Sequence, residues 1–346
     1  MNNKNNTRVF PAEWETDAAI MIAWPHEETD WAPMLADVEE TYTAMAEAFS
    51  RYHTVVIVAP DISKPKKALS HLSDRKILFV QTSTNDTWTR DYGPITVSTD
   101  NHPLLLDFCF NGWGLKFAAN HDNLVTSKLV AAGAFRADRE NHLGFVMEGG
   151  SIDSNGKGSL LTTSECLMSP NRNGDLSREQ VEDYLMDSLG VNRVLWLDHG
   201  YLAGDDTDSH VDTLARFAPN DIILHVAAFD PSDEHFEALT AMAEDLRNLT
   251  TESGSPFNLV ALPLPEAIYD EDGQRLPATY ANFLATNKAV FMPAYRQPNN
   301  DRLAAQILKI AFPEHEIIAV DCYHLIRQHG SLHCATMQIP QQILPI

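Results

Sequence analysis

The chain has 346 residues, and its 44% hydrophobic and 21% charged residues are the composition of an ordinary globular protein. Its formal net charge of −23 at pH 7 repels nucleic acid and anionic membranes, so neither is an expected partner. Four cysteines without a C-x-x-C pair exclude a disulfide scaffold, and no apolar run has the length of a membrane helix. The first eight residues contain no apolar signal segment, so we expect a cytoplasmic protein with reduced thiols.

The predicted elements repeat one order along the chain, which is strand, turn, strand, helix, strand. In chain order, the predicted strands span residues 18–24, 54–59, 76–81, 94–98, 103–110, 144–147, 149–153, 159–164, 193–198, 211–217, 222–229, 258–264, 279–285, 289–295, 316–322 and 334–339. The predicted helices span residues 33–52, 63–72, 123–133, 177–189, 232–249 and 300–310. The first unit lacks its leading strand, so we predict that the last strand of the chain completes it and closes a ring.

A doubly wound parallel sheet is the rival architecture. The turns at 154–158 and 218–221 contain Asn-Gly and Pro-Asn-Asp sequences, which are typical of hairpins and do not suit parallel neighbours. We therefore predict an α/β fold of five strand-strand-helix-strand units in one domain that spans residues 1–346.

Polar residues that do not suit a strand stand at the start of each unit's first strand. They are Asp91, Glu148, His210, Asp212, Asn282 and Cys334. Because equivalent positions of a fivefold ring point at one axis, we predict that these side chains meet there. Polar groups gathered in a protein interior are costly unless they are paired, so this set indicates a functional site.

The residue types of this set favour nucleophilic attack on a cationic substrate. The thiol of Cys334 is the expected nucleophile, and His210 is the expected base and later acid. Carboxylates around a thiolate raise the pKa of the thiol, which is unfavourable unless the substrate is a cation. A guanidinium group fits, since carboxylates bind its planar N–H donors in pairs, and Gly149 and Gly150 would let the backbone approach a flat ligand.

Several of these residues also have a purely structural interpretation. A single Asp or Glu here is more often a turn or cap residue, and His210 alone is more often a hydrogen-bonded structural histidine. The segment 205–208 also fits a solvated acidic loop or a metal loop, and Trp88 and Trp113 also fit plain core aromatics. Cys109, Cys166 and Cys322 are expected to be core residues of apolar strands.

At its motifs the sequence resembles the agmatine deiminases and the bacterial-type peptidylarginine deiminases. The matching segments, in the family's order, are 10–15, 23–25, 85–94, 110–114, 148–151, 204–212, 280–283 and 333–334. The resemblance covers nearly the whole chain. It implies the pentein fold, a fivefold pseudosymmetric α/β propeller, and hydrolysis of a guanidine through a covalent amidino-cysteine.

The resemblance also implies roles for single residues. It makes Cys334 the nucleophile, His210 the acid–base group and Asp212 the acid of the His-x-Asp pair. Asp91, Glu148 and Asp206 fall where the family holds the guanidinium or assists. We add Trp88, Trp113 and Asn282, which belong to the matching motifs, as expected substrate-binding residues.

Four positions depart from the family's pattern. Ser209 and Thr213 stand where glycine and asparagine are common, and Leu115 replaces the usual second glycine after Trp113. The segment 328–331 replaces a glycine-rich run. The catalytic set survives these changes, whereas the pocket for the substrate's tail follows less directly.

The expected activity is hydrolysis of agmatine to N-carbamoylputrescine and ammonia, as in putrescine biosynthesis and polyamine metabolism. The motifs offer acids and no arginine or lysine fork for a carboxylate, which favours agmatine over arginine, although the direction of Arg216 is open. Peptidyl arginine and other small guanidines remain alternative substrates. The sequence leaves open whether the chain forms a homo-oligomer.

Two other functions are alternatives to a deiminase. A zinc-dependent hydrolase would draw its ligands from His210, His329, His333, Cys334 and the acidic loop. No H-E-x-x-H or C-x-x-C motif supports that alternative, so we predict no metal and no cofactor. A non-catalytic binding propeller is the third alternative, and the retained thiol, histidine and acids speak against it.

Overall fold

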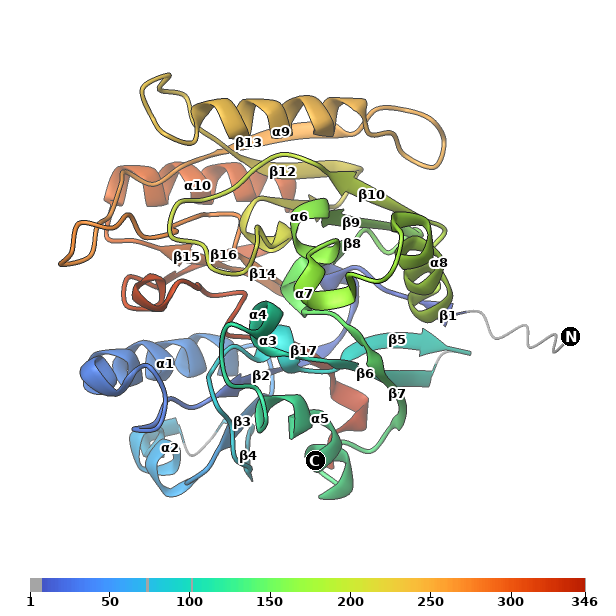
Figure 1. Cartoon of the computed structure of the whole chain (residues 1–346). Helices are drawn as coiled ribbons and strands as arrows, with labels where there is room; N and C mark the ends of the chain where they lie inside the picture. The colour runs from blue at the N-terminus through green and yellow to red at the C-terminus, as the bar shows by residue number, and fades with distance from the viewer. Residues whose placement is uncertain (1–7, 73–74, 101, 346) are drawn as a thin grey trace, which may run out of the picture.

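The computed structural model describes residues 8–72, 75–100 and 102–345, and its strands form five separate sheets (Figure 1). Residues 1–7, on which the expected absence of a signal segment rests, lie outside the described residues. The fold mixes helices and strands, as predicted.

Each sheet contains an antiparallel pair beside a parallel pair. The first sheet adds a second parallel pair, β3–β4, and the second adds a second antiparallel pair, β1–β5. The first sheet has the order β17 (Met337–Pro340), β2 (Ala18–Ala23), β3 (Val55–Ala59) and β4 (Ile77–Gln81). The second sheet has the order β1 (Arg8–Val9), β5 (Ile95–Thr99), β6 (His102–Cys109) and β7 (Asp138–Val146). The third sheet has the order β10 (Arg193–Leu197), β9 (Ser159–Thr163) and β8 (Ile152–Ser154). The fourth and fifth sheets have the orders β11 (Ala215–Ala218), β12 (Ile222–Ala227), β13 (Asn258–Pro263), and β14 (Leu284–Ala285), β15 (Ala289–Ala294), β16 (Glu316–Asp321).

In every sheet a helix connects the strand of the antiparallel pair to its parallel neighbour, as parallel neighbours require. These five crossover helices are α1 (Leu35–Ser50), α5 (Val125–Ala131), α8 (Arg178–Leu189), α9 (Phe236–Asn248) and α10 (Pro298–Ala311). In the first sheet, α2 (Ser63–Ala68) lies between the further parallel pair, β3 and β4. The predicted unit of hairpin, helix and parallel strand is therefore confirmed in four sheets. In the first sheet, β17 takes the place of the missing leading strand. The hairpins also contradict the doubly wound parallel sheet.

The remaining helices are short. They are α2 (Ser63–Ala68), α3 (Thr89–Tyr92), α4 (Gly112–Leu115), α6 (Ser164–Leu167) and α7 (Pro170–Asn173). The 3-10 turns are η1 (Glu13–Glu15), η2 (Ala32–Met34), η3 (Ser70–Leu72), η4 (Asp122–Leu124), η5 (Gly149–Ser151), η6 (Val211–Thr213), η7 (Leu325–Gln328) and η8 (Gln341–Ile343). No helix in the described residues is long and apolar enough to cross a membrane.

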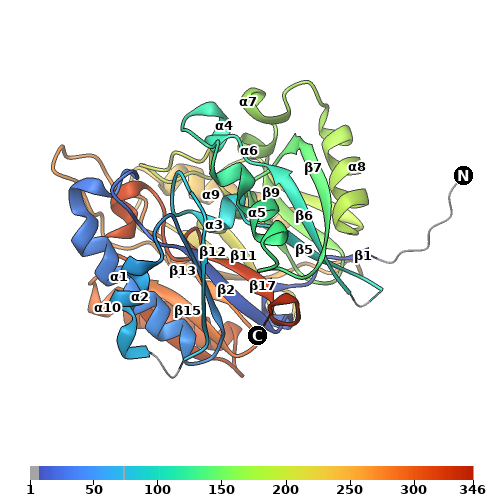
Figure 2. The same ribbon diagram turned by 90° about the horizontal axis from the view of Figure 1, so that it is seen from below.

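The two ends of the chain meet in the first sheet. Strand β17 pairs with β2 in antiparallel register from Met337 opposite Met21 to Pro340 opposite Ala18, and the two lie side by side in Figure 2. The prediction that the last strand completes the first unit is confirmed. All residues of β2 and β3 are buried, and α1 packs against β3.

The predicted leading strands are wrong at their first residues. Predicted strands 149–153 and 211–217 begin as the turns η5 and η6, and those at 279–285 and 334–339 become strands only at Leu284 and Met337. In each of four units, the N–H of one residue donates to the carbonyl three residues earlier. These unit-start turns join Asp91 to Trp88 (3.1 Å), Ser151 to Glu148 (3.1 Å), Thr213 to His210 (3.2 Å) and Thr336 to His333 (3.0 Å). The polar residues thus occupy turns, where their side chains do not follow the alternating directions of a strand.

Candidate active site

The unit-start turns meet at one pocket. Of the predicted residues, Asp91, Trp88, Trp113, Asp206 and Cys334 line it. The remaining lining residues are Asp30, Asp86, Phe117, Thr207, Gln328, His329 and Gly330. The pocket encloses about 520 Å³, including the part open to solvent. His210, Glu148, Asp212 and Asn282 are buried and do not line the pocket. His210, Asp212 and Asn282 contact the lining residues Asp91 and Cys334, as the following distances show.

Cys334 lies at the inner end of the pocket and is held by Asn282. The amide Nδ2 of Asn282 donates to the thiol Sγ at 3.2 Å, and its Oδ1 accepts from the Cys334 N–H at 3.3 Å. Burial, with Asp212 and Asp91 nearby, raises the pKa of the Cys334 thiol well above its usual value, although Asn282 opposes the shift. The thiol is therefore protonated at rest, and a cation bound beside it would favour the thiolate.

Asp91 is fixed at both carboxylate oxygens. The Gly150 N–H donates to Oδ1 at 3.0 Å, and the indole N–H of Trp113 donates to Oδ2 at 3.0 Å. Burial raises the pKa of Asp91 to about 6, and His210 and Trp113 act against this shift. Asp91 is therefore ionised at neutral pH.

The two glycines after Glu148 make room for protein groups, not for the ligand that the sequence suggested. A Cβ on Gly150 would lie 2.6 Å from Nδ1 of His210 and 2.9 Å from Oδ1 of Asp91. A Cβ on Gly149 would lie 2.2 Å from the carbonyl oxygen of Arg90. The expectation that these glycines face a flat ligand is replaced by close packing of the unit-start turns.

His210 is fully buried, with Nδ1 3.7 Å from Oδ1 of Asp91. Among the described residues, neither ring nitrogen has a hydrogen-bond partner in the protein. Burial disfavours the charged ring, but Asp91 and the neighbouring Cys166 and Glu148 raise the pKa of His210 well above its usual value. The imidazole is therefore protonated at rest. Both of its N–H groups are free to donate to a ligand.

Glu148 is balanced by an arginine that the sequence reasoning missed. Nε of Arg172 donates to both carboxylate oxygens of Glu148, at 3.0 and 2.9 Å, and both side chains are fully buried. Arg172 also bonds to Asp208 Oδ2 at 2.5 Å and to the carbonyl of Thr207 at 2.9 Å. No sequence pattern marks Arg172, because its partners are 24 to 36 residues away.

Asp212 has one engaged oxygen and one free oxygen. Its Oδ2 lies 2.7 Å from Nδ1 of His333 and 3.8 Å from the Cys334 thiol. Among the described residues, its buried Oδ1 has no hydrogen-bond partner. Burial works against the charge, but the hydrogen bond and charge of His333 hold the pKa of Asp212 below its usual value. A charged acceptor therefore faces the thiol with one oxygen unused.

The pocket walls are acidic and aromatic. Besides Asp91, the lining contains three carboxylates and three aromatic rings, and no arginine or lysine. They belong to Asp30, Asp86, Asp206, Trp88, Trp113 and Phe117. Burial raises the pKa of Asp86 to about 7, although the Thr87 N–H opposes this, and Asp30 and Asp206 add to it. Arg216, whose direction the sequence left open, points elsewhere and bonds to Glu13 at 2.7 Å. The lining therefore suits a ligand that is cationic at both ends.

The departures from the family's pattern keep the local backbone. Ser209 and Leu115 have φ angles of 59° and 69°, the left-handed conformation that glycine adopts most easily. The hydroxyl of Thr213 donates to the carbonyl of His210 at 2.8 Å and so stays within the unit-start turn. Gly330 packs on Trp88, where a Cβ would lie 2.3 Å from the ring.

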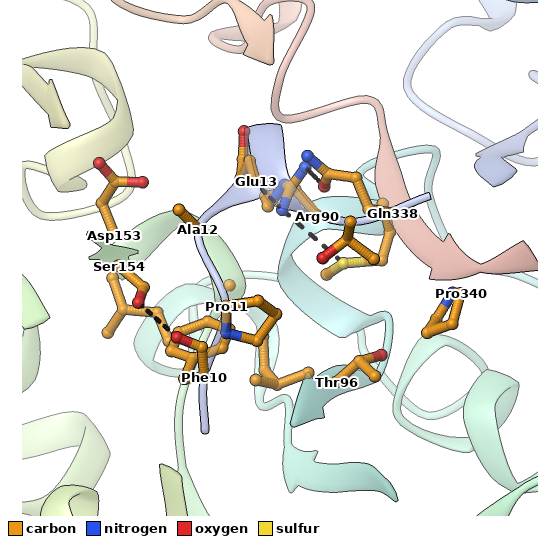
Figure 3. Close-up of a pocket in the computed structure, with 15 residues that line it drawn as sticks. Phe10, Pro11, Ala12, Glu13, Arg90, Thr96, Asp153, Ser154, Gln338 and Pro340 are labelled. Carbon is orange, nitrogen blue, oxygen red and sulfur yellow. Dashed lines mark hydrogen bonds and ion pairs between the residues drawn. The ribbon is translucent and has the colours of Figure 1, made fainter. Parts of the chain in front are cut away.

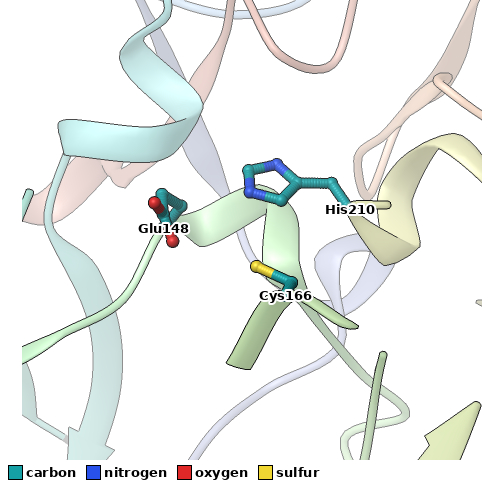
Figure 4. Close-up of side chains that lie close together, drawn as sticks. All are labelled: Glu148, Cys166 and His210. Atoms are coloured by element: carbon teal, nitrogen blue, oxygen red, sulfur yellow. The ribbon is translucent and has the colours of Figure 1, made fainter. Parts of the chain in front are cut away.

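The zinc ligands considered from the sequence do not converge. His333 has a carboxylate on each ring nitrogen, and Nδ1 of His329 lies 2.7 Å from the carbonyl of Gly204. In the described part of the chain, one other group has donor atoms close together: those of Glu148, Cys166 and His210 lie within 4.8 Å of one another (Figure 4). Arg172 already supplies positive charge to Glu148 there, so this group suits a protonated imidazole better than a metal ion.

This group also corrects the prediction for Cys166. The residue is not in a strand but in the short helix α6, where it packs beside His210 and Glu148. Burial raises the pKa of its thiol, although the neighbouring His210 opposes this shift. Cys322 follows β16 and is buried, and Cys109 ends β6 and is partly buried.

The known proteins that this chain resembles are deiminases by name. Residues 9–340 match the family described as Porphyromonas-type peptidyl-arginine deiminase. The agmatine deiminase of Stutzerimonas stutzeri (strain A1501) is 33% identical, and the alignment covers 96% of this chain and 95% of that protein. A C. jejuni agmatine deiminase with a cysteine replaced by serine and substrate bound has a TM-score of 0.91 and 37% identity, covering 99% of this chain and 98% of that one. A Porphyromonas gingivalis protein provisionally named an arginine deiminase has a TM-score of 0.91 and 47% identity, covering 97% and 99%. The mixed α/β fold is thus the fold of pentein-type deiminases.

Proposed function

Because the chain belongs to the Porphyromonas-type peptidyl-arginine deiminase family, we propose that it hydrolyses agmatine to N-carbamoylputrescine and ammonia. The observation that carries this proposal is the pocket lining, which places a thiol among carboxylates and contains no arginine or lysine. Agmatine has a guanidinium at one end and an ammonium at the other, so both ends suit such a lining.

The guanidinium would bind beside Cys334, between Asp91 and the free oxygen of Asp212. Its positive charge lowers the free energy of the thiolate, so the thiol loses its proton to solvent when substrate binds. The thiolate then attacks the guanidinium carbon. Glu148, balanced by Arg172, would help to orient the same group.

His210 would act first as an acid. The imidazolium gives its proton to the departing nitrogen, the C–N bond breaks, and ammonia leaves an amidino group on Cys334. Neutral His210 then takes a proton from water as the water attacks the same carbon. Collapse of this adduct breaks the C–S bond and gives the carbamoyl product, and the proton of the new hydroxyl returns the sulfur to a thiol. The proton released at the start protonates the ammonia, so the cycle is balanced.

The rest of the agmatine molecule would lie along the aromatic wall, with its ammonium near Asp30 and Asp86. A free amino acid would bring a carboxylate into this acidic mouth, where no arginine or lysine of the lining would pair with it. The alternative substrates are peptidyl arginine and other small guanidines. Peptidyl arginine is included because the family's description names it.

Two wider proposals accompany the activity. We propose that the five sheets surround one axis as a fivefold propeller within a single domain, because every sheet repeats the same pairing and four unit-start turns repeat the same hydrogen bond. The proposed place of action is the cytoplasm, in putrescine biosynthesis.

Ammonia release from agmatine, arginine, arginine methyl ester and a blocked peptidyl arginine tests the substrate. We expect kcat/KM for agmatine to exceed that for arginine about 100-fold or more, since roughly 2.8 kcal/mol suffices at about 1.4 kcal/mol per decade. The ester should fall between them. Equal values for arginine and agmatine would overturn the acidic-pocket argument, and activity on the peptide alone would replace the substrate while keeping the chemistry.

A further inference from the structure

A histidine next to the proposed nucleophile joins two carboxylates. Nδ1 of His333 lies 2.7 Å from Oδ2 of Asp212, and Nε2 lies 2.6 Å from Oε1 of Glu13. A carboxylate only accepts hydrogen bonds, so both ring nitrogens of His333 must donate, and the ring is an imidazolium. Glu13 belongs to the N-terminal matching segment, to which the proposed chemistry assigns no task.

The charges around this histidine support the same protonation state. Nη2 of Arg216 lies 2.7 Å from Oε2 of Glu13, Nη1 of Arg90 lies 3.2 Å from Oε1, and Nε of Arg216 lies 3.3 Å from Oδ1 of Asp153. The connected groups are the carboxylates of Glu13, Asp153 and Asp212 and the guanidinium groups of Arg90 and Arg216. Three negative and two positive charges are neutral only when His333 adds a third positive charge. Buried charges need such pairing.

We propose that Glu13 and His333 are positioning residues that hold Asp212 ionised and oriented beside Cys334. This inference rests on the proposed guanidine hydrolysis and names two residues behind its site. His333 fixes one oxygen of Asp212, which leaves the other oxygen free for a substrate N–H. Glu13 holds His333 from the opposite side and so keeps its charge.

The backbone of His333 adds to this arrangement. Its N–H donates to Oδ1 of Asn282 at 2.9 Å, and Nδ2 of the same asparagine donates to the Cys334 thiol at 3.2 Å. The ring and the backbone of one residue therefore position both the acid and the nucleophile. A displacement of His333 would move both.

Glu13 can be changed without opening the core. It borders a second pocket, where its side chain lies near Arg90 and Gln338 (Figure 3). Its side chain is 16% exposed, whereas those of His333 and Asp212 are 1% and 0% exposed. Glu13→Gln keeps the size, removes the charge and replaces one of the two acceptor oxygens by an NH2 donor.

The experiment is a double-mutant cycle with pH profiles of kcat/KM on agmatine, using Glu13→Gln, His333→Gln and the double variant. Other charged or titratable groups that face Asp212 and His333 are unchanged in all three proteins: His210, Arg216, Arg90, Asp91, Asp153 and Cys334. Loss of the imidazolium charge raises the pKa of Asp212. The acid limb of the profile, where kcat/KM falls as the pH is lowered, should therefore move to higher pH in both single variants. We expect each to lose about tenfold or more in kcat/KM at neutral pH, the typical effect of a charge-assisted buried hydrogen bond.

The cycle separates positioning from a merely structural role. If Glu13 acts through His333, the double variant loses no more than His333→Gln alone, whereas independent roles would multiply. The matched control is Glu15→Gln in the same turn, whose carboxylate contacts the Ala12 N–H and not His333, and which should keep the wild-type profile. The inference would be overturned if the loss in the double variant equalled the product of the two single losses. It would also be overturned if the pH profile of Glu13→Gln matched that of Glu15→Gln.

Two measurements keep a failure interpretable. If Glu13→Gln does not fold, as circular dichroism would show, Glu13→Asp replaces it and should retain an acid limb nearer to that of the wild type than that of His333→Gln. A limb in Glu13→Asp that matches His333→Gln would contradict the inference. If the wild-type protein releases no ammonia from any guanidine, the proposed function fails; an active wild type with an unmoved limb in both variants refutes only the positioning pair.

Discussion

Cys334 and His210 rest in protonation states that suit a cationic substrate. Burial and two nearby acids raise the pKa of the thiol, while Asp91, Cys166 and Glu148 raise the pKa of His210 against the effect of burial. The residue types alone suggested that His210 begins as a base. The pKa shifts of the two groups depend on burial and, for His210, on a 3.7 Å contact with Asp91, and neither is visible in the sequence.

We predict that the Trp113 indole influences the lower pH limit of activity through its hydrogen bond to Asp91. The pKa of Asp91 is about 6, and the indole N–H stabilises its ionised form. Trp113→Phe removes this donor, so the pKa of Asp91 rises further. Because the ionised form is needed and is lost as pH falls through this pKa, the acid limb of kcat/KM should move to higher pH.

A pH profile on agmatine measures this shift. Trp196→Phe is the matched control, since its indole N–H donates to the Glu182 carboxylate far from the pocket. An acid limb that stays in place in Trp113→Phe would show that Asp91 does not limit activity there.

Some members of the site were visible in the sequence and others were not. Cys334, Asp91, Asp206 and the two tryptophans line the predicted pocket because they begin or flank corresponding units. Arg172, Glu13 and His333 act through contacts 24 to 320 residues apart, for which no local pattern exists. The buried network of balanced charges behind the pocket could therefore be identified only from the structure.

At the scale of elements, the crossover helices were predictable and the starts of the leading strands were not. Helix α8 begins at Arg178 after the Ser177 cap and ends before Gly190, whose φ of 72° fits a helix C-terminus. The unit-start turns lie in short apolar segments in which the spacing of apolar residues is like that of a strand. Their turns depend on contacts with other units, such as the Gly150 N–H with Asp91, so sequence period alone predicts a strand.

Gly150→Ala tests how tightly the unit-start turns pack. The new Cβ would lie 2.6 Å from Nδ1 of His210 and 2.9 Å from Asp91, so both groups must move. We expect kcat/KM to fall about 100-fold or more, since misplacement by about 1 Å has such effects. Gly144→Ala is the control, because a Cβ there would meet nothing within 4 Å. A folded Gly150→Ala protein with near wild-type kinetics would contradict this packing.

At the scale of the molecule, the last strand joins the two ends of the chain. Ile339 is fully buried in β17 and pairs with Ala19 of β2. Ile339→Ala should therefore lower the free energy of unfolding by about 2–5 kcal/mol, the usual cost of this change in a core. Urea unfolding followed by fluorescence measures this loss.

The control for the closing strand is Ile310→Ala, at a side chain that is 71% exposed. Its effect should stay within about 0.5 kcal/mol, as for other surface changes. If both variants unfold at the same urea concentration as the wild type, β17 adds little to the stability of the first sheet.

The most direct test of the whole account is mass spectrometry of the protein quenched during turnover of agmatine. We predict an amidino adduct on the peptide that contains Cys334, and none on Cys109, Cys166 or Cys322. Cys334→Ser should form no adduct and release no ammonia, because a hydroxyl is a far weaker acid than a thiol. An active Cys334→Ser protein, or an adduct on another cysteine instead, would contradict the account.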